Sequence, residues 1–130
     1  MPIRVVQLGS PRTPGEGLRL GTVRRPPRGV KKDDFARRDF FDLWLPDLAP
    51  RPRLFAFAKS APWTDRRWAA YAKKYRAEMR APAAQRLIAL LAALSHSASF
   101  SVGCYCDDEA RCHRSLLREL LRDAGAAIRG

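Results

Sequence analysis

The chain has 130 residues, a length that suits one ordinary hydrophobic core and is short for two. It carries 25 lysines and arginines against 13 acidic residues, which gives a formal net charge of +12. No run approaches the roughly 20 apolar residues needed to cross a bilayer, and the start lacks the apolar stretch of a secretory signal. We therefore expect a cytoplasmic protein without a membrane partner.

The basic surplus has two interpretations. Such a charge attracts nucleic acid, phosphates or an anionic surface through its long-range field. Arginine and alanine are also abundant while lysine is scarce, which is typical of the coding bias of a GC-rich genome. The charge alone therefore predicts no particular activity.

The first third of the chain predicts strands joined by long loops. Residues 3–8 are β-branched and apolar enough for a buried strand, and a Gly-Ser-Pro turn follows at residues 9–11. Residues 12–38 are rich in basic residues, proline and glycine, which favours loop, with a short strand at residues 18–23. The aromatic stretch at residues 33–48 has no clean period, and we interpret it as broken helix packed on a sheet.

The middle of the chain predicts two helices after an ambiguous apolar run at residues 54–58. Thr64 can cap the first helix, whose apolar residues follow a helical spacing and are expected in the core: Trp68, Tyr71, Tyr75 and Met79. Pro82 suits the first turn of the second helix. Its expected buried stripe consists of four leucines: Leu87, Leu90, Leu91 and Leu94.

The last third alternates like a strand over residues 99–105 and then predicts a helix over residues 114–124, which Gly125 ends. Leucines at positions 116, 117, 120 and 121 should face inward. Together the patterns predict an α/β fold: a single compact domain over residues 1–130, with a small, mostly parallel sheet flanked by helices.

The residues with the most distinctive chemistry lie in one segment, residues 104–114, between that strand and that helix. In α/β sheets ligands bind where strand carboxyl ends and helix amino ends meet, because the unpaired helix N–H groups attract anions. The position alone makes the segment a candidate site.

A metal site is one interpretation of this segment. Cys104, Cys106 and Cys112 with His113 offer the soft thiolate and imidazole ligands that zinc or iron prefers. The spacing is not the paired C-x2-C of a zinc ribbon, and the adjacent Cys112 and His113 are expected to diverge from a common ion. An odd number of cysteines within nine positions also argues for reduced thiols rather than structural disulfides.

Two other interpretations remain open for the same cysteines. Cys112 lies near a helix amino terminus among Arg111, His113 and Arg114, which favours a reactive thiolate. The phosphatase pattern of a cysteine followed six positions later by arginine is absent. Alternatively, the cysteines are small packing residues, because free cysteine is among the most buried residue types.

Four short motifs follow one another along residues 18–124: Pro27-Arg28-Gly29-Val30-Lys31-Lys32, Trp44-Leu45-x2-Leu48-Ala49-Pro50, Trp68-x2-Tyr71-x3-Tyr75-x2-Glu78-Met79 and Cys112-His113-Arg114. In these motifs the chain resembles the YeaO-like family, domain of unknown function 488. The resemblance implies a compact α/β domain and no established reaction. It also implies a shared pocket around His113, Arg24 and Arg28, and a fold that does not depend on metal, since some members lack the thiols.

The chain departs from the family before the Pro-Arg-Gly motif. Members resemble Val-Asp-Arg-Leu-Trp there, whereas residues 22–26 of this chain keep only the arginine, Arg24. Any role that rests on the family's aspartate or tryptophan therefore does not carry over.

Our first functional hypothesis is a site for a small anionic or phosphorylated ligand at the strand-to-helix loop. Arg24, Arg28 and Arg114 would donate hydrogen bonds to it, and His113 and Cys112 would carry any chemistry. The alternatives are a nucleic-acid-binding module, with residues 12–32 and 66–80 on the phosphate backbone, and a metal- or redox-sensing protein that uses Cys104, Cys106 and Cys112. The sequence does not decide whether the protein is an enzyme.

Overall fold

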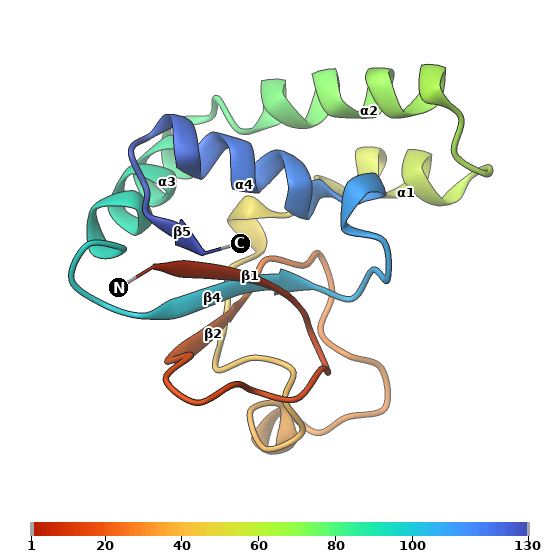
Figure 1. Ribbon diagram of the computed structural model, residues 1–130. Coiled ribbons are helices and arrows are strands. Elements are labelled where there is room, and N and C mark those ends of the chain that lie inside the picture. Colours follow the sequence, from red (N-terminus) through yellow and green to blue (C-terminus); the bar gives the residue numbers. More distant parts are fainter. Residues whose placement is uncertain (1, 130) are drawn as a thin grey trace.

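A five-stranded parallel sheet organises the computed structural model, which describes residues 2–129 (Figure 1). The strands are β1 (Ile3–Gln7), β2 (Leu18–Gly21), β3 (Leu43–Trp44), β4 (Phe100–Cys104) and β5 (Ile128–Arg129). Their order is β3-β2-β4-β1-β5, and each neighbouring pair is parallel. The central strand, β4, therefore comes from the last third of the chain.

Four α-helices within residues 2–129 cover one side of the sheet (Figure 1). They are α1 (Pro52–Lys59), α2 (Asp65–Glu78), α3 (Pro82–Leu94) and α4 (His113–Asp123). Short 3-10 turns at Lys32–Asp34, Pro46–Leu48 and Glu109–Arg111 punctuate the loops. Over the described residues, each helix falls short of the length and apolarity that a membrane span requires.

The main core lies between the sheet and the helices. Alternation along the strands sends Ile3, Leu20 and Val102 to this side, where each is at most 5% exposed. The helices contribute aromatic and aliphatic side chains to the same cluster, among them Tyr71, Tyr75, Met79, Ile88, Leu91, Leu116, Leu117 and Leu121.

The other side of the sheet is covered by loops instead of helices, and a close approach of Phe41 explains the glycine at position 21. A Cβ atom at Gly21 would lie 2.3 Å from the Phe41 ring, a distance that no real side chain tolerates. Phe41 belongs to a second, smaller core cluster with Leu8 and Val23. The loop of residues 32–42 can therefore pack directly on β2.

A buried ion pair also lies on the loop-covered side. Arg19 is 0% and Glu16 3% exposed, and two hydrogen bonds join them: Nε to Oε2 at 2.8 Å and Nη2 to Oε1 at 3.0 Å. Ser101 on β4 donates to the same carboxylate at 2.8 Å. The pair thus links the loop before β2 to the centre of the sheet.

The predicted fold class is confirmed, as a single sheet with helices packed on it. Residues 33–48 correct the expectation of a broken helix, because they form 3-10 turns and the short edge strand β3. The ambiguous run at residues 54–58 lies in α1.

The predicted stripe of α3 is partly wrong. Leu90 and Leu94 are 52% and 40% exposed. The buried face instead carries Ala84, Ile88, Leu91 and Ala92. Small alanine side chains let the helix approach its neighbours closely, so the helix is rotated relative to the leucine pattern.

Candidate metal centre

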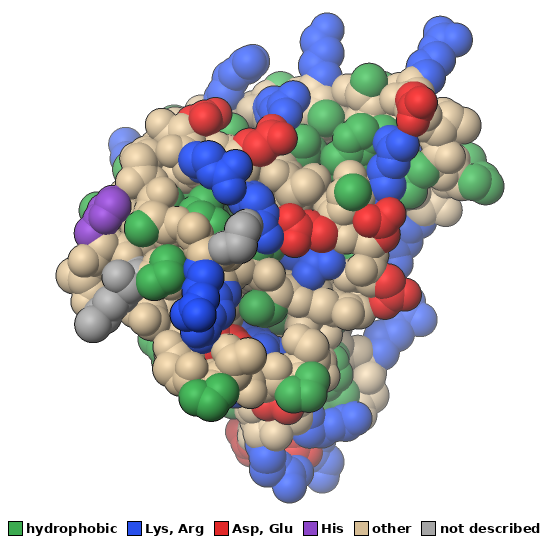
Figure 2. Space-filling model, in the orientation of Figure 1, with side chains coloured by type: hydrophobic (Ala, Val, Ile, Leu, Met, Phe, Trp, Pro, Cys, Tyr) green, Lys and Arg blue, Asp and Glu red, His purple; other side chains and the backbone are tan. Residues whose placement is uncertain are grey.

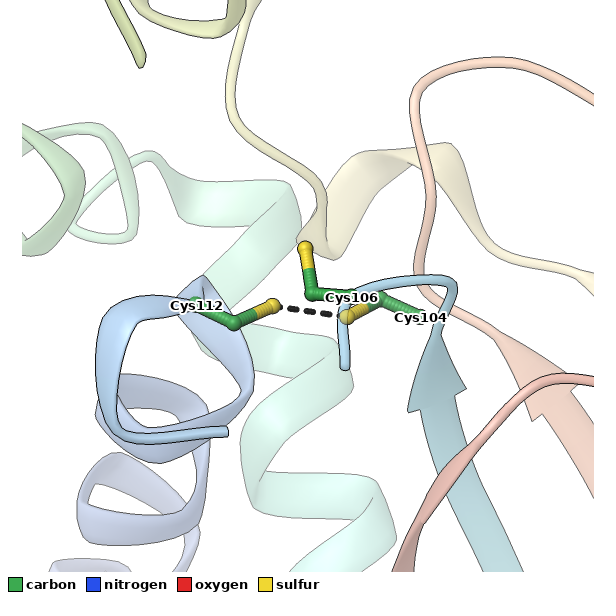
Figure 3. A group of neighbouring side chains, drawn as sticks. All are labelled: Cys104, Cys106 and Cys112. Atoms are coloured by element: carbon green, nitrogen blue, oxygen red, sulfur yellow. Dashed lines mark hydrogen bonds between the residues drawn. The ribbon is translucent and has the colours of Figure 1, made fainter. Parts of the chain in front are cut away.

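Three cysteines converge where β4 ends and α4 begins (Figure 3). Cys104 is the last residue of β4, and Cys112 precedes the first turn of α4. The Sγ atoms of Cys104, Cys106 and Cys112 all lie within 4.8 Å of one another. The Sγ atoms of Cys104 and Cys112 are closest, 2.6 Å apart.

The three thiols differ in exposure and in acidity. Cys104 and Cys112 are buried, and Cys106 is exposed. Hydrogen bonds with Cys104 and Cys112, together with the positive charge of Arg114, lower the pKa of Cys106. The pKa of Cys104 is raised by its hydrogen bonds to the other two thiols and by burial. Deprotonation is therefore favoured at Cys106 and disfavoured at its two buried neighbours.

Cys112 keeps its proton for a related reason. Its hydrogen bond with Cys104 would lower the pKa of Cys112, but its contact with Cys106 and its burial outweigh that effect and raise this pKa to about 12. Three thiolates cannot coexist here without a compensating positive charge.

His113 lies beside the thiol cluster, next to Cys112. Its Nε2 lies 2.6 Å from the backbone carbonyl oxygen of Thr22, which can only accept, so Nε2 carries the proton. Burial lowers the pKa of His113 to about 4, so the ring is neutral at pH 7. Nδ1 then presents a lone pair, and it lies 3.7 Å from Sγ of Cys112.

Arg114 brings a fixed positive charge to the same place. Its Nη2 donates to the carbonyl oxygen of Cys106 at 2.7 Å, and the residue is 4% exposed. Its Nε is buried and has no hydrogen-bond partner among residues 2–129. The guanidinium is therefore close enough to stabilise negative charge on the thiols.

Side-chain hydrogen bonds hold the loop that carries Cys106. Gln7 donates to the carbonyl oxygen of Tyr105 at 3.1 Å and to Oδ1 of Asp107 at 2.7 Å. The side chain of Asp108 accepts from the backbone N–H of Ala110 at 3.0 Å. These contacts tie the loop to the end of β1 and give it a defined shape.

The structure gathers most of the predicted site residues in one place. Cys104, Cys106, Cys112, His113 and Arg114 lie together. Cys112 has an extended backbone, at φ −136° and ψ 150°, and its Sγ lies 3.7 Å from Nδ1 of His113. The idea that Cys106 is a packing residue is wrong, because this side chain is exposed.

Of the two arginines predicted from the early loop, Arg24 has backbone partners of its own. Arg24 donates to the backbone carbonyl oxygens of Pro50 at 2.9 Å and Pro46 at 3.1 Å, so its guanidinium holds the turn before α1. Arg28 is exposed. The Thr22 carbonyl, which fixes the ring of His113, escaped sequence reasoning because a backbone oxygen leaves no mark in a side-chain pattern.

In a comparison with known protein families, the model described as the active DUF488-N3 subclade matches residues 3–125. No curated protein and no solved structure matches the chain. The matched region includes the whole sheet except β5, all four helices and the thiol cluster. The chain belongs to the DUF488 family, within its DUF488-N3 subclade.

Proposed function

We propose that this protein is a metalloprotein that binds zinc through Cys104, Cys106 and Cys112. The observation that carries the proposal is the clustering of the three sulfur atoms within 4.8 Å. Tetrahedral zinc with bonds of about 2.3 Å to sulfur places its thiolates about 3.8 Å apart, within that limit. The buried pair at 2.6 Å would separate by about 1 Å to admit the ion.

The electrostatics of the cluster favour a divalent cation. Without one, the raised pKa values of Cys104 and Cys112 favour the protonated form of both thiols, beside the more acidic Cys106. Zinc binds deprotonated sulfur and would displace both protons. Three thiolates around one Zn²⁺ leave a net charge of −1, which the buried guanidinium of Arg114 can balance.

His113 is the best candidate for a fourth ligand. Its Nε2–H donates to a backbone carbonyl, which is the arrangement that orients metal-binding histidines and leaves Nδ1 free. The ring is neutral, as a ligand must be. A cubane iron–sulfur cluster usually needs four cysteines, and the chain has three, so this donor set favours zinc over such a cluster.

Reduced thiols are a condition of this proposal. Thiols persist in a reducing compartment, so zinc binding and the cytoplasmic location expected from the sequence support each other.

Elemental analysis of protein purified without oxygen or chelator tests the proposal. We expect one zinc ion per chain, and Co²⁺ should replace it with the intense absorption of thiolate ligation. Cys106→Ser should weaken the metal affinity about 100-fold, because a structural zinc site worth 10–16 kcal/mol spreads over four ligands at about 3 kcal/mol each. Cys106 is exposed, so this variant retains the core.

His113 and His96 provide a matched pair. His113→Ala should weaken zinc binding, while His96→Ala should leave it unchanged, since His96 contacts the Gly125 carbonyl near the end of α4. Protein that contains no zinc, takes up no Co²⁺ and keeps three freely titratable thiols would overturn the proposal. An equal zinc affinity in wild type and Cys106→Ser, measured by competition with a chelator, would do the same.

The other sequence-based hypotheses stay predictions. For an anionic ligand at the strand-to-helix loop, the double variant Arg28→Ala with His113→Ala should lose ligand-induced thermal stabilisation without unfolding. For nucleic acid, affinity should fall steeply with salt. Lys and Arg side chains are spread over much of the visible face, including the part over α2 (Figure 2). This distribution supports a general attraction to anions rather than a single defined interface.

A further inference from the structure

A second concave region lies on the loop-covered side of the sheet, apart from the thiols. It has a volume of about 540 Å³ and is lined by Arg4, Gln7, Ser10, Thr13, Arg19 and Arg129, among others. We propose that this cavity, called here the arginine pocket, binds a small phosphorylated ligand through Arg4 and Arg129. The proposal is independent of metal binding by the cysteines.

The first argument is the charge that remains after the internal ion pair is counted. Glu16 is the acidic residue of the lining, and its two oxygens accept from Nε and Nη2 of Arg19. Nη1 of Arg19 donates hydrogen bonds to the carbonyl oxygens of Ser10 and Asp39, at 2.8 and 2.7 Å. This pair is neutral, so Arg4 and Arg129 are the two charged residues of the lining without an acidic partner among residues 2–129.

The second argument is the register of the strands. Arg4 on β1 lies directly opposite Arg129 on β5, and neighbouring strands are about 4.8 Å apart. Both side chains leave the same face of the sheet. Like charges directly opposite each other repel, and among residues 2–129 neither arginine has an acidic partner within ion-pair distance. A bound dianion would bridge them and remove the repulsion.

The third argument is an unused donor. Nη1 of Arg4 is buried and has no hydrogen-bond partner among the described residues. Such orphaned donors are rare in folded proteins because each loses its hydration without compensation. A phosphate oxygen would supply the missing acceptor.

The lining also specifies the kind of molecule. The guanidinium fork matches the oxygens of a phosphate group. The residues that line the pocket include no aromatic ring on which a nucleobase would stack. Ser10 donates its hydroxyl proton to the carbonyl of Gln7, so its oxygen remains free to accept from a ligand hydroxyl. Guanidinium donors for a phosphate, together with the Ser10 oxygen as an acceptor for a hydroxyl group, fit a phosphorylated sugar or polyol.

Isothermal titration of the full chain at low salt tests the proposal with ribose 5-phosphate, inorganic phosphate and unphosphorylated ribose. We expect ribose 5-phosphate to bind, phosphate to compete with it and ribose to show no heat of binding. Arg4→Gln and Arg129→Gln should each weaken ribose 5-phosphate at least about tenfold. Arg86→Gln, an exposed arginine on α3, removes the same charge and should change the affinity less than twofold.

Several outcomes would overturn the inference. One is that wild type does not bind ribose 5-phosphate, and another is that Arg86→Gln loses as much affinity as Arg4→Gln and Arg129→Gln. A third is that a single-stranded oligonucleotide binds more tightly than ribose 5-phosphate and depends on the same two arginines. Arg129 is exposed, so Arg129→Gln keeps the test valid if Arg4→Gln does not fold. Cys106→Ser should bind ribose 5-phosphate like wild type, which separates this result from the fate of the zinc proposal.

Discussion

Replacing Glu16 by glutamine should destabilise the protein strongly although it changes one atom. The carboxylate is 3% exposed and accepts hydrogen bonds from Arg19, from Ser101 and from the backbone N–H of Thr13. Glutamine fits the same space but leaves the fully buried guanidinium of Arg19 without a counter-charge. The expected loss is therefore the penalty of an unpaired buried cation.

Two estimates of this loss agree. Burial alone would raise the pKa of Glu16, but its hydrogen bonds with Arg19, Ser101 and Thr13 outweigh burial and lower the pKa from 4.5 to about 2. That difference corresponds to about 3 kcal/mol of folding free energy at neutral pH. Removing one member of a buried ion pair generally costs about 3 to 5 kcal/mol. A domain with 5–15 kcal/mol of stability would survive the change with a much lower unfolding midpoint.

The assay is urea unfolding at pH 7, with Asp65→Asn as the control. Asp65 pairs with Arg111 at 2.7 Å but is 97% exposed, so its loss should cost at most about 1 kcal/mol. Because the folded pKa of Glu16 is depressed, its contribution is complete above pH 4.5 and disappears as the pH falls toward 2. The difference in free energy of unfolding between wild type and Glu16→Gln should therefore decrease as the pH falls from 4.5 toward 2. Equal midpoints for Glu16→Gln and Asp65→Asn at pH 7 would refute the reasoning.

Two further substitutions probe the helices. Leu117→Ala should lower the free energy of unfolding by about 2 to 5 kcal/mol, because Leu117 is 0% exposed. The control Leu90→Ala removes a side chain that is 52% exposed and should change this free energy by less than about 0.5 kcal/mol. Similar urea midpoints for the two variants would contradict the assignment of Leu117 to the core. Thr64→Ala should cost about 1 kcal/mol by thermal unfolding, since the Thr64 hydroxyl accepts from the Arg67 N–H at 3.1 Å, and an unchanged Tm would show that this cap contributes nothing.

Elements with a strong local pattern were predictable from the sequence. The β-branched run of β1, the Thr64 cap of α2 and the leucine spacing of α4 each appear in the structure. Edge strand β3 has two residues, too few to show any period. The face that α3 buries depends on whether the neighbouring elements leave room for alanine or for leucine side chains. The sequence of the helix alone does not contain that information.

The thiol cluster was predictable as a segment but not as a geometry. Cys104 and Cys112 are eight positions apart, and only the turn between β4 and α4 brings their sulfurs together. The arginine pocket was missed entirely. Arg4 and Arg129 lie near opposite ends of the chain, and their adjacency follows from a sheet order that no local pattern reveals.

The position of β4 has a consequence for how the chain folds during synthesis. β1 hydrogen-bonds to β4 and β5, and β4 also separates β1 from β2. A nascent chain therefore holds its first strand without a sheet partner until residue 104 has left the ribosome, while the neighbouring helices α1 and α2 can already associate. Contacts so distant in sequence slow folding, and a product truncated before residue 100 would expose unpaired strand edges to aggregation.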